Sequence, residues 1–305
     1  MLLILTASID GTSDLILSRL GNQAFRFNFD LFNEYHLELS NSGWNITNPA
    51  GQSINSENVT GIFWWKVTSY RAHQDEFINE EIKYVFRELY WWGVHRGIAK
   101  GIPPDFHNRN GKISILAKAK PYFYMPETLV TWGFKSLPYQ KTMVAKSLSS
   151  SFSSDNQALF TTPIDPQKLD PSFPWYIQDK IDATYDVTTF VCGQKLFGFK
   201  RDRNTLKGLD WRLEQDFTGH SEEWIPRSHS EQETTSILDF CRDLGVDWGR
   251  IDFLEQGDGK LIFLEYNANG QWVFLDYSQK YGLIEAVIEY LTANNKAFKA
   301  HLLPT

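Results

Sequence analysis

Residues 249–272 decide the fold that we expect for this chain, and they read GRIDFLEQGDGKLIFLEYNANGQW. Two apolar segments, 250–256 and 261–267, flank the tetrapeptide Gly257-Asp258-Gly259-Lys260. An Asp-Gly pair between two such segments favours a two-residue type I′ turn, so we predict that the segments form a β-hairpin. With that turn, Asp252 lies opposite Glu265.

Polar side chains gather on one face of this hairpin. Because side chains alternate along a strand, Asn267 projects from the same face as Glu265 and Asp252. Oxygen ligands without histidine or thiolate suit magnesium that bridges phosphates better than they suit zinc. The other face carries apolar residues that can pack on a core, namely Ile251, Phe253, Leu264 and Tyr266.

The same two carboxylates could instead lie exposed on the solvated face of an edge hairpin. Like charges directly opposite each other are unfavourable without a counter-charge, and this favours a bound cation. The pattern alone does not identify the phosphate donor.

The N-terminal half has the pattern of a small α/β unit. Residues 1–6 form an apolar strand, 13–20 a short helix that Gly21 ends, and 25–29 a strand in which phenylalanine alternates with polar residues. Residues 61–67 form a further strand. An amphipathic helix follows at 75–97, with the apolar residues Phe77, Ile78, Ile82, Val85, Phe86 and Leu89.

Breaker residues at 101–111 indicate a domain boundary, and the chain beyond it has α+β character. We predict a helix at 112–122, a hairpin turn at Gly193-Gln194, and strands at 143–147, 175–181, 185–192 and 195–200. The serine-rich stretch 147–154 is typical of a loop. Ser230 and Glu233 form a capping box, which opens a helix that runs to Leu244.

Composition excludes several classes of protein. The 305 residues are 42% hydrophobic and 22% charged, the usage of an ordinary globular chain long enough for two or more structural units. The formal charge of -7 argues against binding of nucleic acid or of an anionic membrane. The two cysteines lack a paired spacing and no apolar run is long enough to span a bilayer, so we expect a cytoplasmic protein.

The end of the hairpin resembles a known family. Asp252, FLEYN at 263–267 and NGQW at 269–272 resemble the metal-binding hairpin of ATP-grasp enzymes, and more closely that of the ligases that macrocyclise graspetides of the microviridin type. Further blocks match this family in order across nearly the whole chain: FRF at 25–27 with Asp30, PETLVT at 126–131, AKSLSS at 145–150, QDKI at 178–181 and DWR at 210–212.

This resemblance implies α/β and α+β architecture in the ATP-grasp fold. An N-terminal pre-ATP-grasp α/β domain would occupy 1–108, a central ATP-grasp subdomain 109–177, and a C-terminal subdomain with the metal-binding hairpin 178–305. The two α+β subdomains would clasp ATP between them.

The resemblance also assigns site residues. Asp252, Glu265 and Asn267 would hold Mg²⁺ on the phosphates of ATP. Arg212 and Lys146 are assigned as catalytic, because both would neutralise charge on the phosphates. The nucleotide-binding set is Lys112, Lys146, Ser147, Ser149, Ser150, Gln178, Asp179, Lys180, Ile181, Asp186 and Arg212.

These assignments have alternatives, and some positions depart from the family pattern. Lone lysines are more often solvated surface residues, the serine stretch could be a plain linker, and Arg212 could form a surface ion pair. Asp179 stands where the family has glutamate, and Thr188 where it has an arginine associated with handling the substrate peptide. The stretch from Lys112 to Pro126 is one residue shorter than is usual in the family, so Lys118 or Lys120 could take the role of Lys112.

The implied activity is a ligase that passes the γ-phosphoryl group of ATP to a carboxylate, after which an amine or a hydroxyl displaces phosphate. The expected substrate is a ribosomally made precursor peptide with a leader segment, held near 205–227, whose Asp or Glu side chains are macrocyclised. A homodimer is expected. Two alternatives stay open: a ligase that adds a free amino acid to a peptide or protein carboxylate, and a nucleotide-binding scaffold without catalysis.

Overall fold

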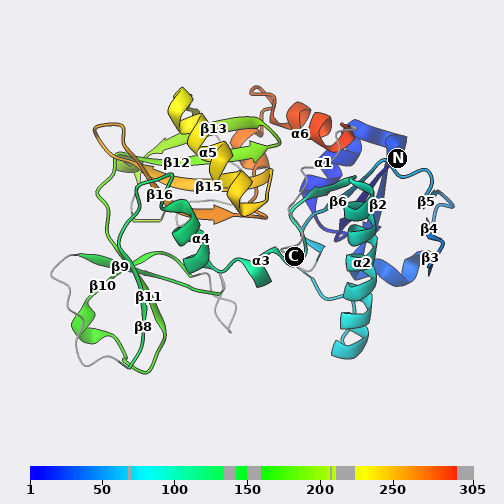
Figure 1. The fold of residues 1–305 in the computed structure, drawn as a ribbon, viewed down its shortest axis with the longest axis horizontal. Coiled ribbons are helices and arrows are strands. Elements are labelled where there is room, and N and C mark those ends of the chain that lie inside the picture. Colours follow the sequence, from blue (N-terminus) through cyan, green and yellow to red (C-terminus); the bar gives the residue numbers. More distant parts are fainter. Residues whose placement is uncertain (68–69, 134–141, 150–158, 207, 211–223, 294–305) are drawn as a thin grey trace.

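The computed structural model of the chain describes residues 1–67, 70–133, 142–149, 159–206, 208–210 and 224–293. Its N-terminal part contains a parallel sheet with the strand order β2 (Ala24–Asn28), β1 (Leu2–Thr6), β6 (Gly61–Trp64) and β7 (Ala99–Gly101) (Figure 1). α1 (Gly11–Leu20) connects β1 to β2, so the predicted βαβ unit is confirmed. A separate antiparallel sheet follows, formed by β3 (His36–Ser40), β4 (Gly43–Thr47) and β5 (Ser53–Asn55).

α2 (Glu76–Arg96) has the predicted limits. Asp75 accepts a hydrogen bond from Phe77 N at 2.9 Å at its start, and Gly97 ends it with φ of 71°. Phe86 of α2 is buried against the parallel sheet, whereas Phe77 is 73% exposed and Ile78 is exposed as well. The prediction that Phe77 and Ile78 belong to the buried face is wrong, because the first turn of α2 extends past the sheet (Figure 1).

The C-terminal part is built on an antiparallel sheet with the order β14 (Ile225–Pro226), β13 (Lys195–Asp202), β12 (Tyr185–Cys192), β15 (Trp248–Glu255) and β16 (Leu261–Asn267). We call it the large sheet. α4 (Lys112–Ala119), which follows the short α3 (Phe106–Arg109), and α5 (Glu231–Leu244) pack together against it. The predicted capping box of α5 is confirmed, since Glu233 N donates to Ser230 Oγ at 3.2 Å and Ser230 N donates to Glu233 Oε2 at 2.8 Å.

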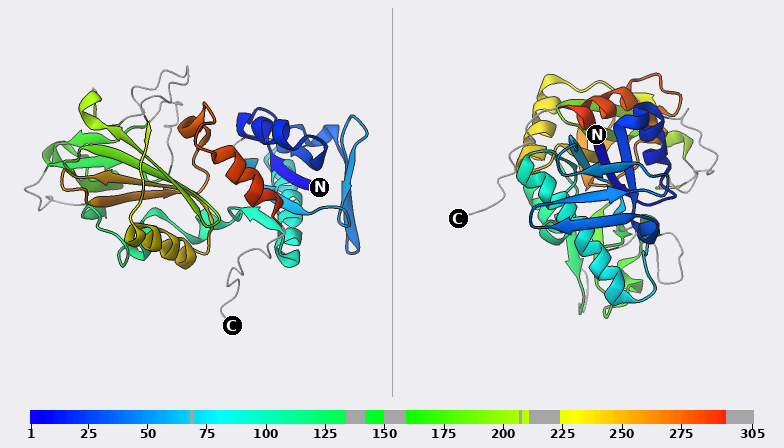
Figure 2. Two further views of the ribbon diagram at one scale, coloured as in Figure 1. Left: turned by 90° about the horizontal axis from the view of Figure 1, so that it is seen from above. Right: turned by 90° about the vertical axis from the view of Figure 1, so that its right-hand side faces the viewer.

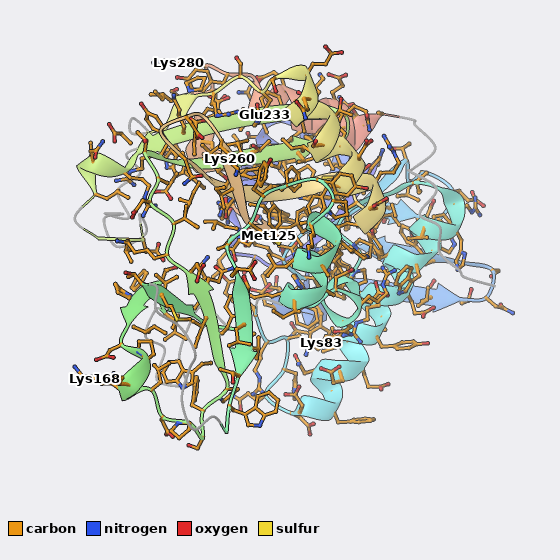
Figure 3. All side chains as sticks on the ribbon, turned by 60° about the vertical axis from the view of Figure 1, so that its left-hand side comes forward. Lys83, Met125, Lys168, Glu233, Lys260 and Lys280 are labelled. Atoms are coloured by element: carbon orange, nitrogen blue, oxygen red, sulfur yellow. The ribbon has the colours of Figure 1, made fainter. Side chains whose placement is uncertain are left out.

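A second antiparallel sheet, the small sheet, has the order β10 (Thr162–Ile164), β9 (Met143–Lys146), β11 (Trp175–Asp179) and β8 (Thr128–Thr131). After α4 the chain first runs beside β16, where Phe263 N donates to Tyr124 O at 2.7 Å, and then crosses to β8. Figure 3 shows Met125 at this crossing, with Lys260 in the loop between β15 and β16 and Lys168 in the turn between β10 and β11.

α6 (Leu283–Thr292) ties the large sheet to the N-terminal part, because it packs against β12 and also against α1 and β6 (Figure 2). The rings of Trp65 and Trp248, 5.9 Å apart, join the same two parts in one core. We retain the division at 1–108, 109–177 and 178–305 as a proposal. Among the described helices, none has the length and apolar composition that crossing a membrane requires.

The β15–β16 hairpin has the predicted pairing of Asp252 with Glu265 but not the predicted turn. Gln256 N donates to Lys260 O at 3.0 Å, so residues 257–259 form a longer loop, and the type I′ prediction is wrong. A β-bulge next to Asp252 compensates for the longer loop, because Leu264 has no partner across the hairpin. Leu264 also lines the cavity described below, so its assignment to the apolar face is wrong.

The first prediction concerns Gly249 at the start of the hairpin. Its φ is +131°, and a Cβ there would lie 2.6 Å from the buried Tyr266 Oη, which donates to Trp248 O. Gly249→Ala should therefore lower the free energy of unfolding by about 2 kcal/mol or more. The measurement is thermal unfolding followed by circular dichroism.

Gly257→Ala is the matched control in the loop of the same hairpin. A Cβ at Gly257 would meet only Thr184 Oγ1, at an ordinary 3.7 Å. The control should change stability by less than about 0.5 kcal/mol. Equal melting temperatures for the two variants would contradict the close approach of Tyr266 to Gly249.

Candidate functional site

A cavity of about 560 Å³ lies between the small sheet and the large sheet. Both sheets, α4 and the segments that follow β13 and β16 contribute to its walls. Each predicted site residue that the structure describes lines this cavity: Lys112, Lys146, Ser147, Ser149, Gln178, Asp179, Lys180, Ile181, Asp186, Asp252, Glu265 and Asn267. Ser150, Arg212 and most of the expected leader surface at 205–227 lie outside the described residues.

The large sheet carries a row of polar side chains, of which Asp252, Glu265 and Asn267 line the cavity. Thr188, Asp252 and Glu265 stand directly opposite one another on β12, β15 and β16. Thr188 Oγ1 donates to Asp252 Oδ1 at 2.7 Å. Asn267 Nδ2 donates to Asp252 Oδ2 and, at 3.3 Å, to Glu265 Oε1. Asn267 therefore bridges the other two predicted metal ligands, Asp252 and Glu265.

This donor set fits a hard divalent cation. Two carboxylates and an amide supply oxygen atoms only, which Mg²⁺ prefers, and turning the Asn267 amide about its Cβ–Cγ bond would exchange its donor for a carbonyl oxygen. Clusters of three or more histidine, cysteine or carboxylate side chains do not occur within the described residues. Mg²⁺ bound by few protein ligands also needs oxygen atoms from a substrate, such as phosphates.

Arg250 neutralises the charge of Asp252 in this structure. Its Nε and Nη2 donate to the two carboxylate oxygens of Asp252, each at 3.1 Å, and its Nη1 donates to Gln271 O at 2.9 Å. Arg250 is 9% exposed, and its guanidinium lies 5.6 Å from the ring centre of Phe274. We did not predict Arg250, Gln271 or Phe274 as cavity residues.

Lysines bring positive charge to the same cavity. Val144 and Lys146 on β9 stand opposite Gln178 and Tyr176 on β11, so these side chains share the face that turns to the cavity. Burial lowers the pKa of Lys146, and the carboxylate of Glu265 opposes this shift. A bound anion next to Lys146 would therefore favour the charged form of its side chain.

Lys112 is the lysine of its segment that reaches the cavity. Its Nζ donates to Ser147 O at 2.5 Å, which links the first turn of α4 to the end of β9. Lys118 Nζ instead donates to Asn110 Oδ1 at 3.2 Å, and neither Lys118 nor Lys120 lines the cavity. Of the three lysines that could contact the phosphates of ATP, Lys112 is therefore the one whose position fits.

Residues 178–181 form one end of the cavity together with apolar side chains. Val144, Val187 and Leu264 line this end from both sheets. Gln178 Nε2 donates to Thr128 Oγ1 at 3.0 Å and to Tyr176 Oη at 3.1 Å, whereas its buried Oε1 has no partner within the described residues. This arrangement suits a flat ring that carries a hydrogen-bond donor at its edge.

Asp186 and Arg203 form an ion pair on the cavity wall, with Arg203 Nη1 2.5 Å from Asp186 Oδ1. Burial raises the pKa of Asp186 to about 6, although Arg203 opposes this shift. Asp210, the first residue of the DWR block, also lines the cavity and accepts a hydrogen bond from Thr161 N at 3.1 Å. Arg203 is a further cavity residue that no sequence pattern indicated.

Comparisons of sequence found no match: no protein-family model and no curated protein sequence matches the chain. Comparisons of structure did. A RiPP-associated ATP-grasp ligase from Chryseobacterium gregarium, in complex with ADP and a leader and core peptide, is 19% identical with a TM-score of 0.77, covering 95% of this chain and 96% of that chain.

Two further structures match over the same extent. Macrocyclase MdnC from Microcystis aeruginosa MRC, bound with precursor peptide MdnA, is 20% identical with a TM-score of 0.75 over 95% of this chain and 99% of that chain. ATP-grasp ligase PsnB, complexed with a minimal precursor variant, Mg and ADP, is 14% identical with a TM-score of 0.69 over 96% and 98%. The chain therefore has the fold of the ATP-grasp ligases, as its sequence motifs predicted.

The second prediction concerns the half-buried side chain of Lys146. Because burial lowers its pKa, the charged form destabilises the folded protein at neutral pH, and this penalty vanishes as the pH rises to the ordinary lysine value of 10.5. Lys146→Met should raise the melting temperature of the ligand-free protein at pH 7 by roughly 2–4 °C, the effect of about 1 kcal/mol in a chain of comparable size.

Differential scanning calorimetry checks this prediction. Lys168→Met is the control, because the Lys168 side chain is 83% exposed on the same subdomain and should leave the melting temperature unchanged. A lower melting temperature for Lys146→Met would show that the neighbouring carboxylates already stabilise the ammonium without a ligand.

Proposed function

We propose that the protein is an ADP-forming carboxylate ligase that uses ATP and Mg²⁺ to macrocyclise Asp or Glu side chains of a ribosomally made precursor peptide. One observation carries this proposal: a single cavity in which Lys146 of the small sheet faces the Asp252, Glu265 and Asn267 cluster of the large sheet. The solved structures of this fold support it, since they are described as ligases or macrocyclases with ADP, Mg or precursor peptides.

In this mechanism the protein positions and neutralises reacting groups. The adenine ring occupies the apolar end between Val144 and Leu264, next to residues 178–181. Lys112 and Lys146 offset charge on the phosphates, as do Ser147, Ser149 and, in the sequence-based assignment, Ser150 and Arg212. Bound by Asp252, Glu265 and Asn267, Mg²⁺ would supply further positive charge beside the transferred group.

The reaction then needs no side-chain nucleophile. A substrate carboxylate oxygen attacks the γ-phosphorus, the bond to the bridging oxygen breaks, and ADP leaves with that electron pair. An amine or hydroxyl of the same peptide attacks the acyl-phosphate carbon, loses its proton, and releases inorganic phosphate. The enzyme's share is proximity and electrostatic stabilisation.

The third prediction concerns nucleotide choice. The unpaired Gln178 Oε1 can accept a hydrogen bond from the 6-amino group of adenine, whereas guanine presents a carbonyl oxygen there. Gln178→Leu should therefore reduce the preference for ATP over GTP by roughly 10-fold, about 1.4 kcal/mol. Competition of ATP and GTP for a fluorescent nucleotide measures this.

The control is Gln167→Leu, which changes an exposed glutamine on the small-sheet subdomain outside the cavity. It should keep the wild-type preference. If Gln178→Leu discriminates between ATP and GTP as well as the wild type does, adenine does not bind at this end of the cavity.

The fourth prediction tests the activity itself. The purified protein is incubated with ATP, Mg²⁺ and any small acidic peptide encoded beside its gene, and the peptide is followed by mass spectrometry. We expect the loss of one water per bond formed. Asn267→Ala should slow the reaction on the order of 100-fold, since a group that acts on the transferred phosphate is lost, and the exposed Asn204→Ala should not.

Other outcomes point elsewhere. A mass gain equal to an added amino acid would establish a ligase that extends a carboxylate. Stabilisation by ATP without any ADP release would establish a nucleotide-binding scaffold. The proposal also includes the sequence-based expectations of a cytoplasmic homodimer that acts without nucleic acid or membrane.

A further inference from the structure

A hydrogen bond joins the N-terminal part of the chain to the wall of the cavity. Thr12 Oγ1, in the first turn of α1, donates to Gln271 Oε1 at 3.0 Å. Thr12 is buried, whereas Gln271 is exposed and lines the cavity. The side chain of a cavity residue is therefore held by a different part of the chain.

Gln271 lies next to the metal-ligand cluster, which consists of Asp252, Glu265 and Asn267. Arg250 bridges it to this cluster, because Nη1 donates to Gln271 O at 2.9 Å and Nη2 donates to Asp252 Oδ2 at 3.1 Å. The residue before Gln271 donates its backbone N–H to Asn267 O at 3.2 Å, which turns the chain directly after β16. Gln271 thus stands at the end of the cavity where the proposed mechanism places the transferred phosphoryl group.

The FRF block and the aspartate that follows it hold the segment that precedes Thr12. Arg26 donates to Ala7 O and, at 2.9 Å, to Ser8 O. Asp30 accepts hydrogen bonds from Ser8 N at 2.8 Å and from Ser8 Oγ at 2.5 Å. These contacts give the block a structural role, since they fix the segment that leads from β1 into α1.

Asp10 fixes the first turn of α1 itself. Its Oδ1 accepts hydrogen bonds from Ser13 N at 2.7 Å, from Ser13 Oγ at 2.8 Å and from Trp65 Nε1 at 3.0 Å. Trp65 is fully buried and packs against Trp248 of the large sheet. The Thr12 hydroxyl is therefore presented to the cavity wall from a rigid element.

The Thr12 hydroxyl determines which way the Gln271 amide faces. Because Oε1 accepts the bond from Thr12, the group left for a ligand is Nε2 with its two N–H donors, and Nε2 has no hydrogen-bond partner within the described residues. At this end of the cavity the side-chain donors of Arg250 and Asn267 already bond to other residues of the protein. Gln271 Nε2 is thus a donor that remains available to an incoming oxyanion.

We propose that Gln271 Nε2 holds the side-chain carboxylate of the substrate peptide beside the γ-phosphate, and that Thr12 is the positioning residue that keeps this donor turned toward it. The inference rests on the proposed ligase function and adds the residue that orients its substrate. One carboxylate oxygen accepts the hydrogen bond from Nε2, which leaves the other oxygen to attack the γ-phosphorus. If the amide were turned over, its Oε1 would face the carboxylate and repel it.

The experiment measures ADP release by the full chain at varied peptide and saturating MgATP concentrations. The probe is an acidic peptide that loses water with the wild type. Gln271→Met keeps the length of the side chain but removes the donor, so it should lower kcat/KM for the peptide at least 10-fold, about 1.4 kcal/mol. The KM for ATP should stay at its wild-type value, and the exposed Gln167→Met is the control that should change neither.

Gln271→Glu tests whether the amide contacts the substrate or only joins two parts of the chain. A carboxylate at this position still accepts the bond from Thr12 but offers no donor to the peptide. This variant should therefore be at least as slow with the peptide as Gln271→Met. A wild-type kcat/KM for Gln271→Glu would show that Gln271 only joins the two parts, and the proposal would be wrong.

Variants of Thr12 test its positioning role. Thr12→Val should lower kcat/KM for the peptide roughly 5-fold, about 1 kcal/mol, and Thr12→Ser, which keeps the hydroxyl, should restore most of it. In the Gln271→Met background, Thr12→Val should have no further effect, because it acts only through Gln271. Additive losses would contradict this role. Thr292→Val, which removes an exposed hydroxyl that donates to Ile288 O at 2.7 Å on α6, should behave as the wild type.

The outcomes separate the orienting role from the ligase function. If the wild type removes water from the peptide and Gln271→Met does so with unchanged kcat/KM, the orienting role is wrong and the function stands. If Gln271→Met raises the KM for ATP as much as it lowers kcat/KM for the peptide, Gln271 serves the nucleotide, and the orienting role is wrong too. If no acidic peptide loses water with the wild type, the function fails and the orienting role with it.

Discussion

The register of β12, β15 and β16 is the constraint on which the candidate site depends. It places Thr188, Asp252 and Glu265 in one row, and Asn267 joins the row from the same strand as Glu265. If one strand were shifted by one residue relative to its neighbour, its polar side chains would point to the opposite face of the sheet, which packs on the core. Arg250 balances the charge that this row accumulates. A Cβ at Gly270 would lie 3.0 Å from Asn267 Cβ and 3.1 Å from Arg250 Cβ, so a side chain there would displace both residues.

Much of the fold followed from local signals. The caps of α2 and α5 and the alternation in β2 specify elements through contacts a few residues apart, which a sequence displays directly. The hairpin turn did not follow, because Asp258-Gly259 is compatible with a longer loop when a bulge at Leu264 absorbs the extra residue. The longer loop and the bulge shift the pairing by one residue in opposite directions, so Asp252 is still paired with Glu265.

The candidate site was predictable only where residues form a motif. The blocks around Lys146, Gln178 and Asp252 meet in one cavity although they lie far apart in the chain. Arg203 and Arg250 were missed because an isolated cation has no sequence pattern. Their place in the cavity follows from contacts such as the ion pair between Arg203 and Asp186, which only the folded chain brings together.

The central claim is that a peptide carboxylate becomes an acyl phosphate in this cavity. The most direct measurement uses the acidic peptide with ¹⁸O in its side-chain carboxylates and analyses the released phosphate by mass spectrometry. Our account predicts that each bond formed transfers one ¹⁸O atom to inorganic phosphate, because the attacking carboxylate oxygen leaves with the phosphoryl group. Bond formation with unlabelled phosphate would contradict it.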